Sequence, residues 1–93
     1  MTTLSIIIPV YNERDTLHTV ISQVEAVDYA KEIILIDDYS TDGTRDLLKE
    51  YEGRENFQVF YHDHNKGKGS ALRTGFSKIN GDMKFPVVIL FLY

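Results

Sequence analysis

Two isoleucine-rich runs in this chain end abruptly in polar side chains, and a stretch long enough for one helix lies between them. The runs cover residues 4–10 and residues 33–36. Continuous apolar runs of this kind predict strands that are buried on both faces. Such strands occur in parallel sheets, where polar groups at the carboxyl ends of neighbouring strands form ligand sites. The pattern therefore indicates an α/β fold with a site at one edge of its sheet.

The rest of the chain alternates between helical and extended patterns. Apolar residues recur at helical spacing over residues 13–27, 42–51 and 70–79, and two more strands are predicted at 57–61 and 87–92. The alternating segment 57–61 is typical of an edge strand. We expect Asn12 or Asp15 to cap the first helix, and Thr41 or Asp42 the second. The order predicts a Rossmann-like three-layer α/β/α fold with a mostly parallel sheet, in a single domain over residues 1–93.

Composition narrows the possible functions. The chain has 93 residues and a formal net charge of -4, so it lacks the basic surface that nucleic-acid binding requires. It has no cysteine, which excludes a disulfide framework and a thiolate zinc site. Its start shows no basic segment followed by a long apolar run, so no signal peptide is expected. We therefore expect a cytoplasmic protein that binds a small ligand.

Two carboxylates, Asp37 and Asp38, directly follow the second predicted strand. Adjacent residues on an extended strand point to opposite sides, so one can reach a ligand while the other bonds the local backbone. Asp38 lies farther into the loop and is the predicted ligand-binding residue. The alternative is that both carboxylates only cap the turn and the next helix.

The end of the first strand carries three further candidates, Pro9, Tyr11 and Glu13. Pro9 has no N–H group and is expected to end the strand. Tyr11 can offer a ring face to a planar base, and Glu13 can accept hydrogen bonds from a ribose or a base. For Tyr11 the alternative is ordinary packing.

The segment 65–75 opens the third predicted helix with glycines and with the cations Lys66, Lys68 and Arg73. Such a segment favours an anion at the helix start, although it matches neither the dinucleotide fingerprint nor a Walker A loop. The alternative is a loop with a helix cap. Just before it, His62, Asp63 and His64 are expected to form a solvated turn without a metal.

Three segments together resemble the amino-terminal half of a family 2 glycosyltransferase of GT-A fold. They are SIIIPVYNE at 5–13, EIILIDDYSTDGT at 32–44 and NKGKGSALRTG at 65–75. The nearest branch is that of the dolichyl-phosphate mannose synthases and polyprenyl-phosphate glycosyltransferases. The resemblance implies transfer of a sugar, with inversion, from a UDP- or GDP-sugar to a lipid-phosphate or saccharide acceptor. By matching position, it implies that the nucleotide-binding residues are Pro9, Tyr11, Glu13, Ile36, Asp38, Lys66 and Arg73.

The chain departs from the family pattern after Gly81-Asp82. In the family, the strand that follows ends in an Asp-x-Asp motif that holds Mg²⁺ or Mn²⁺ on the donor diphosphate, and no such motif occurs in residues 83–93. We therefore expect a chain truncated after its fourth strand, with no metal site, no catalytic residue and no activity alone. The resemblance places the parent protein at the cytoplasmic face of a membrane.

Two alternatives remain at this point. The first is a non-catalytic interaction or oligomerisation module that associates with itself through exposed strand edges. The second is a receiver-like α/β domain, although a receiver carries its acidic pair after the first strand, and here the pair follows the second.

Overall fold

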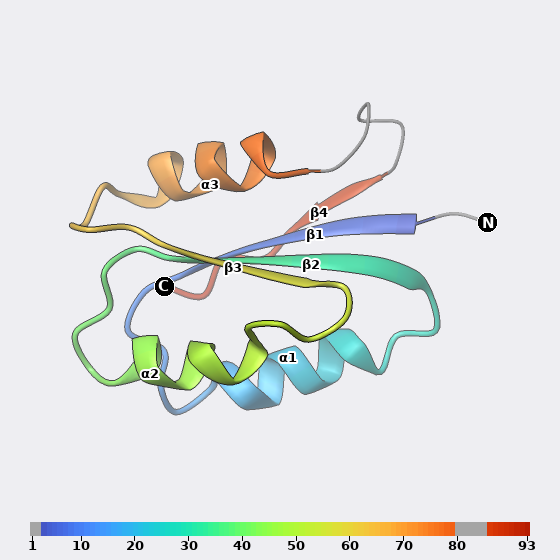
Figure 1. The fold of residues 1–93 in the computed structure, drawn as a ribbon, viewed down its shortest axis with the longest axis horizontal. Helices are drawn as coiled ribbons and strands as arrows, with labels where there is room; N and C mark the ends of the chain where they lie inside the picture. Colours follow the sequence, from blue (N-terminus) through green and yellow to red (C-terminus); the bar gives the residue numbers. More distant parts are fainter. Residues whose placement is uncertain (1–2, 80–85) are drawn as a thin grey trace.

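A four-stranded parallel sheet lies between two helical layers in the computed structural model, which describes residues 3–79 and 86–93 (Figure 1). The elements in chain order are β1 (Thr3–Val10), α1 (Leu17–Glu25), β2 (Ala30–Asp37), α2 (Thr44–Leu48), the 3-10 helix η1 (Lys49–Tyr51), β3 (Phe57–Tyr61), α3 (Lys68–Ser77) and β4 (Val87–Ile89). The strand order is β3-β2-β1-β4, and neighbouring strands are parallel. Helices α1 and α2 cover one face and α3 covers the other. The predicted α/β/α architecture is confirmed.

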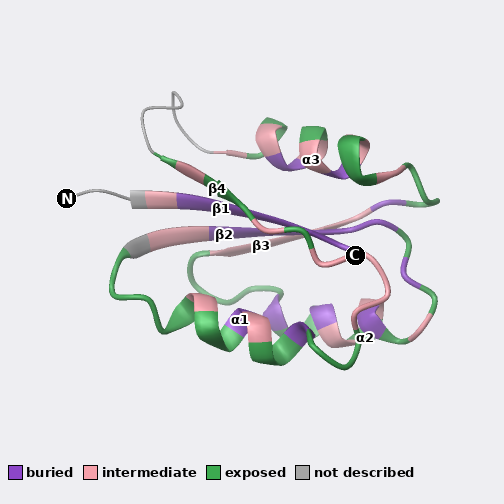
Figure 2. Cartoon of the chain, turned by 180° about the vertical axis from the view of Figure 1, so that it is seen from behind, coloured by how far each residue is buried: buried purple, intermediate pink, exposed green. Residues whose placement is uncertain are grey.

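The isoleucine-rich runs form the centre of the molecule, as Figure 2 shows by the buried colour of β1 and β2. Because side chains alternate along a strand, Ile6 and Ile8 pack with α1 while Ile7 packs toward α3. Burial of each such side chain stabilises the fold by roughly 1.5–3 kcal/mol. The sheet is therefore a rigid base for the loops at its carboxyl edge.

Pro9 does not end the first strand, so that prediction was wrong. The carbonyl of Pro9 accepts a hydrogen bond from Leu92 on the β4 side, so the missing N–H group also faces β4. The β2 side of β1 is unaffected, and β1 continues to Val10. The β4 ladder, in contrast, is interrupted: it ends at Ile89, and a separate bridge joins Val10 to Leu92.

α1 and α2 begin later than the sequence predicted, whereas α3 begins earlier, at Lys68 instead of residue 70. The cap positions of α1 and α2 also differ from the prediction, and Gly43, not Thr41 or Asp42, occupies that of α2. α1 starts at Leu17 because the carbonyl of Glu13 closes a turn with the N–H groups of Thr16 and Leu17. The cap position is Thr16, which makes no side-chain cap bond, so the prediction of Asn12 or Asp15 was wrong. α2 follows Gly43, whose positive φ of 101° suits glycine.

The two edge strands differ in how well they are covered. β3 is an edge strand, as predicted, and its residues are half-buried. β4 was predicted as part of a longer buried run, but Val88, Ile89 and Phe91 are exposed. The Gly81-Asp82 pair lies outside the described residues. No helix within 3–79 and 86–93 is long and apolar enough to cross a membrane.

Candidate functional site

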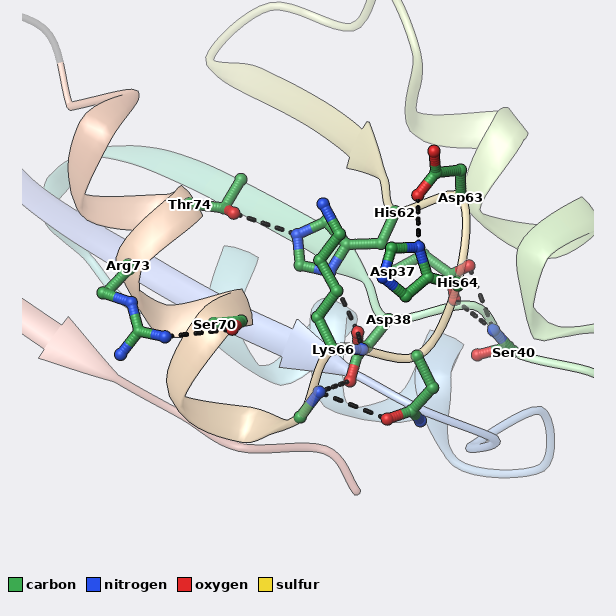
Figure 3. Close-up of polar contacts among 12 residues, drawn as sticks. Asp37, Asp38, Ser40, His62, Asp63, His64, Lys66, Ser70, Arg73 and Thr74 are labelled. Carbon is green, nitrogen blue, oxygen red and sulfur yellow. Dashed lines mark hydrogen bonds and ion pairs between the residues drawn. The ribbon is translucent and has the colours of Figure 1, made fainter.

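Asp38 is the centre of the polar cluster at the carboxyl edge of the sheet (Figure 3). Its side chain is fully buried. Oδ1 accepts hydrogen bonds from the N–H group of Lys66 at 2.8 Å and from Nδ1 of His62 at 2.9 Å. Oδ2 accepts from the N–H group of Gly67 at 2.9 Å and from the hydroxyl of Tyr93 at 2.6 Å. One carboxylate thus joins the end of β2 to the loop before α3 and to the segment after β4.

The hydrogen bonds of Asp38 also determine its charge. Burial alone raises the pKa of this carboxyl, but the bonds from the Lys66 N–H group, Tyr93, His62 and the Gly67 N–H group together hold the pKa below its ordinary value of 3.8. Asp38 is therefore ionised at neutral pH. Its negative charge is stabilised by donors that the fold has already positioned.

His62 corrects one expectation. The run His62-Asp63-His64 was predicted to be a solvated turn, but His62 is buried. Because the Asp38 carboxylate can only accept, Nδ1 of His62 donates to it, and Nε2 lies 2.9 Å from the hydroxyl of Thr74. His64 and Asp63 are exposed and bond each other, as a solvated turn would allow. Sequence reasoning missed His62 because nothing near it in the chain marks it as a partner of Asp38.

Asp37 has the structural role expected of the other carboxylate. It accepts hydrogen bonds from the N–H group of Ser40 at 3.4 and 3.2 Å, and it pairs with Arg45 at 3.0 Å. The same Arg45 nitrogen donates to the carbonyl of His62. The two adjacent carboxylates therefore diverge, Asp37 toward α2 and Asp38 toward the loop before α3.

The loops after β1 and β2 are bonded to each other. The N–H group of Asn12 donates to the hydroxyl of Ser40 at 2.9 Å, and the side-chain Oδ1 of Asn12 accepts from the N–H group of Thr41 at 2.7 Å. The N–H group of Glu13 donates to Thr44, and the Glu13 carboxylate accepts from Thr16 at 2.7 Å. Asn12, another residue that sequence reasoning did not include in the site, has a positive φ of 51°, which Asn tolerates.

Aromatic rings gather beside Asp38. The ring of Tyr11 is half-buried and lies 5.8 Å from the ring of Tyr93, tilted by 32°. Nζ of Lys68 lies over the Tyr93 ring at 5.2 Å and over the Phe91 ring at 6.0 Å. Burial, followed by the hydrogen bond to Asp38 and then the Asp38 charge, raises the pKa of the Tyr93 hydroxyl above 10.0. Tyr93 thus contacts both members of the predicted pair, Tyr11 through its ring and Asp38 through its hydroxyl.

The remaining predicted residues lie around this cluster at different depths. Pro9 and Ile36 are buried neighbours in β1 and β2, and Ile36 packs its side chain below α3. The Lys66 side chain is exposed, although its backbone binds Asp38. Arg73 is also exposed and donates to the hydroxyl of Ser70 at 3.0 Å. Figure 3 shows Arg73 on α3 and Lys66 in the loop before it, close to Asp38.

Comparison with known proteins identifies the family. A family model described as "Glycosyl transferase family 2" matches residues 5–92. The chain belongs to glycosyl transferase family 2. The resemblance seen in the three sequence segments is therefore confirmed, and the family assignment does not support the receiver-like alternative.

Relatives of this family 2 chain are longer than the chain itself. An undecaprenyl-phosphate 4-deoxy-4-formamido-L-arabinose transferase from Pseudomonas syringae pv. syringae (strain B728a) is 36% identical over 86 residues, which cover 86% of this chain and 26% of the relative. Two crystal structures of S. aureus TarS share the fold, with TM-scores of 0.80 and 0.79. Each is 23% identical and matches 98% of this chain, which corresponds to 27% of the TarS 1-349 chain and 16% of the other.

The resemblance implies a divalent cation for full-length members of the family. The residues that follow β4 in this chain do not offer suitable ligands for such a cation. The positions after Ile89 are Leu90, Phe91, Leu92 and Tyr93. Their only side-chain oxygen is the Tyr93 hydroxyl, which donates to Asp38, whereas Mg²⁺ binds through oxygen ligands such as carboxylates. Over residues 3–79 and 86–93, no group of three or more His, Asp or Glu side chains could hold a metal ion. The described residues therefore do not form a binding site for this metal.

Proposed function

We propose that this chain is the amino-terminal, nucleotide-binding part of an inverting family 2 glycosyltransferase that uses a UDP- or GDP-sugar. The observation that carries the proposal is that Tyr11 and Asp38 both contact Tyr93 at the carboxyl edge of the sheet, where α/β folds bind ligands. A ring face and a buried, ionised carboxylate together suit a planar base that carries N–H groups. Family membership supports a sugar nucleotide as the ligand.

The cations of the α3 segment complete the proposed site. Lys66, Lys68 and Arg73 lie in or just before the first turns of α3, and their side chains are exposed. Cations at a helix start stabilise a diphosphate by charge, and the backbone dipole adds to this. A lipid-phosphate or saccharide acceptor belongs, in this proposal, to the full-length parent at the cytoplasmic face of a membrane.

The proposal assigns no catalytic residue and no metal to this chain. A diphosphate leaving group requires charge neutralisation, and the residues after β4 supply no carboxylate for a cation. We therefore expect binding without turnover in the isolated chain. The proposed site consists of the residues that the family resemblance implies, Pro9, Tyr11, Glu13, Ile36, Asp38, Lys66 and Arg73, with Lys68 as a further cation.

Isothermal titration calorimetry with UDP and with GDP, each with and without Mn²⁺, tests this function. We expect weak binding that changes little with the metal and that is lost in Asp38→Ala. The matched control is Asp63→Ala, since Asp63 is an exposed acid in the same loop region and bonds only His64 among its contacts here. Circular dichroism would establish that each variant is folded.

Two results would contradict the proposal. One is strong dependence of binding on Mn²⁺, and the other is unchanged binding in a folded Asp38→Ala. If Asp38→Ala does not fold, Tyr11→Ala takes its place. The Tyr11 ring is half-buried and packs on Tyr93, so this variant removes the stacking surface.

Self-association is a second function that one observation favours. The edge strand β4 exposes Val88 at 44% and Ile89 at 39%, and Phe91 beyond it at 44%. Unpaired edges with apolar side chains pair readily with another chain. We expect light scattering to show association that grows with concentration and is weakened by Ile89→Lys. Thr19→Lys adds the same charge on the exposed face of α1 and should leave association unchanged. A clean monomer at high concentration would rule out this function.

A further inference from the structure

We propose that Tyr93 acts as an internal competitor for the nucleotide, because it already contacts both Tyr11 and Asp38. This inference rests on the proposed function, since it assumes that those two residues receive a base. It goes beyond that function by assigning an autoinhibitory contact to a residue of the chain itself.

The position of the Tyr93 ring resembles that expected for a bound base. Its ring centroid lies 5.8 Å from that of Tyr11, within the range of favourable aromatic pairs. Its hydroxyl donates to Oδ2 of Asp38 at 2.6 Å, a short bond to an ionised acceptor. A planar ring with one donor aimed at Asp38 makes the same two contacts that the base would make. The ring and the base therefore cannot occupy the site together.

The bonds of Asp38 leave only one oxygen exchangeable. Oδ1 is held by the Lys66 N–H group and by His62, and both belong to the loop that connects β3 to α3. Oδ2 is shared between the Gly67 N–H group and Tyr93. Departure of Tyr93 would free one lone pair on Oδ2, while the other contacts keep the carboxylate in place. That free position is suited to accept an N–H group of a base.

Lys68 is engaged by the same ring. Its Nζ lies 5.2 Å from the Tyr93 centroid, so the ammonium group interacts with the face of the ring. When the ring leaves, this contact is lost and Lys68 becomes available for a phosphate. One movement thus releases a hydrogen-bond acceptor for the base and a cation for the diphosphate.

Release of Tyr93 requires little change in the backbone. The N–H group of Leu92 donates to the carbonyl of Pro9 at 2.8 Å, and the carbonyl of Leu92 accepts from the N–H group of Tyr11 at 2.7 Å. These bonds fix the segment to β1 up to Leu92. The Tyr93 side chain can therefore turn out of the site while β4 and the bridge beyond it remain paired.

Calorimetry on three variants tests the competitor. We expect Tyr93→Ala to bind UDP or GDP roughly tenfold more tightly than the unaltered chain, which corresponds to a site that Tyr93 occupies about nine-tenths of the time. Tyr93→Phe keeps the ring but loses the bond to Asp38, so we expect an intermediate affinity. Tyr29→Ala is the control: Tyr29 is 52% exposed and lies at the opposite edge of the sheet, before β2.

The ring itself gives a second readout. In a chain with isotope-labelled tyrosines, the Tyr93 ring signal, assigned by its loss in Tyr93→Phe, should move toward that of an exposed tyrosine as UDP or GDP is added. The Tyr29 signal should not move. The titration is made on the unaltered chain and uses only Tyr93→Phe for assignment, so it remains decisive if Tyr93→Ala does not fold.

The outcomes separate the two proposals. If the unaltered chain binds nucleotide and both Tyr93 variants bind equally or less tightly, the competitor is overturned and the nucleotide site stands. If the Tyr93 signal stays fixed at saturating nucleotide, the competitor is also overturned. If no variant binds UDP or GDP, the proposed function fails and the competitor fails with it.

Discussion

The Asp38 carboxylate connects segments that are distant in the sequence. Its four hydrogen-bond partners come from the loop between β3 and α3 and from the segment after β4. Two of the donors are backbone N–H groups, those of Lys66 and Gly67, and Asp38 is the charged group that accepts from both. The residue that we propose binds the nucleotide is therefore also a structural centre, and its substitution affects stability.

Asp38→Asn is expected to lower the free energy of unfolding by about 2–3 kcal/mol at neutral pH. The amide removes the charge that strengthens these bonds, and its NH₂ group cannot accept from Lys66 or Gly67. Urea unfolding followed by circular dichroism measures the change. Asp63→Asn, at an exposed acid, should change stability by less than about 0.5 kcal/mol. Equal losses in the two variants would contradict the central role of Asp38.

Some residues of the candidate site could be predicted from the sequence. The divergence of Asp37 and Asp38 follows from the alternation of side chains on a strand, and it could be foreseen from their position alone. The partners His62 and Tyr93 could not, because their contacts with Asp38 span 24 and 55 residues and depend on how the loops close. Only the folded chain shows that His62 is buried.

At the scale of elements, the contact of α3 with the sheet depends on Gly75. This residue is buried, and a Cβ added to it would lie 3.0 Å from Cδ1 of Ile36 and closer still to Cγ2 of Ile7. Both isoleucines belong to the layer beneath α3. The absence of a side chain at Gly75 is what allows the helix to approach β1 and β2 closely.

Gly75→Ala is therefore expected to destabilise the chain by about 1–3 kcal/mol, because the added methyl group overpacks the layer. Gly69→Ala is a matched comparison on the same helix. Its Cβ would meet only the flexible end of Arg73 at 3.6 Å, so improved helix propensity should raise stability by about 0.5 kcal/mol. Chemical denaturation measures both. Shifts of the same sign in the two variants would contradict this account of the packing.

The positions of the strands could be predicted better than the ends of the helices. Continuous apolar runs identify β1 and β2 because their burial on both faces requires it. The start of α1 depends instead on a backbone turn closed by the Glu13 carbonyl, and the start of α2 on the positive φ of Gly43. The starts of α1 and α2 both lie next to the hydrogen bonds that join the loops after β1 and β2. Helical periodicity contains no information about those bonds.

At the scale of the whole molecule, the contact between Asp38 and Tyr93 makes stability depend on pH in both directions. The Asp38 pKa is lowered from 3.8, and a lowered acid pKa stabilises the folded state at pH values above the unfolded pKa. This stabilisation is lost as the pH falls from about 4 through the folded pKa. In urea unfolding, the difference between the unaltered chain and Asp38→Asn should narrow below pH 4. A constant difference from pH 6 to pH 3 would contradict this linkage.

The alkaline limb follows from Tyr93, whose pKa is raised above 10.0 by burial and by the Asp38 charge. A raised pKa stabilises the folded state below the unfolded pKa, and this contribution is lost as the pH rises from 10 through the folded pKa. Tyr93→Phe cannot ionise, so its stability deficit relative to the unaltered chain should shrink above pH 10. Tyr29→Phe, which changes an exposed tyrosine, controls for general alkaline effects. If the stability deficit of Tyr93→Phe instead stays constant from pH 8 to pH 11, the pKa of Tyr93 is not raised in the folded state.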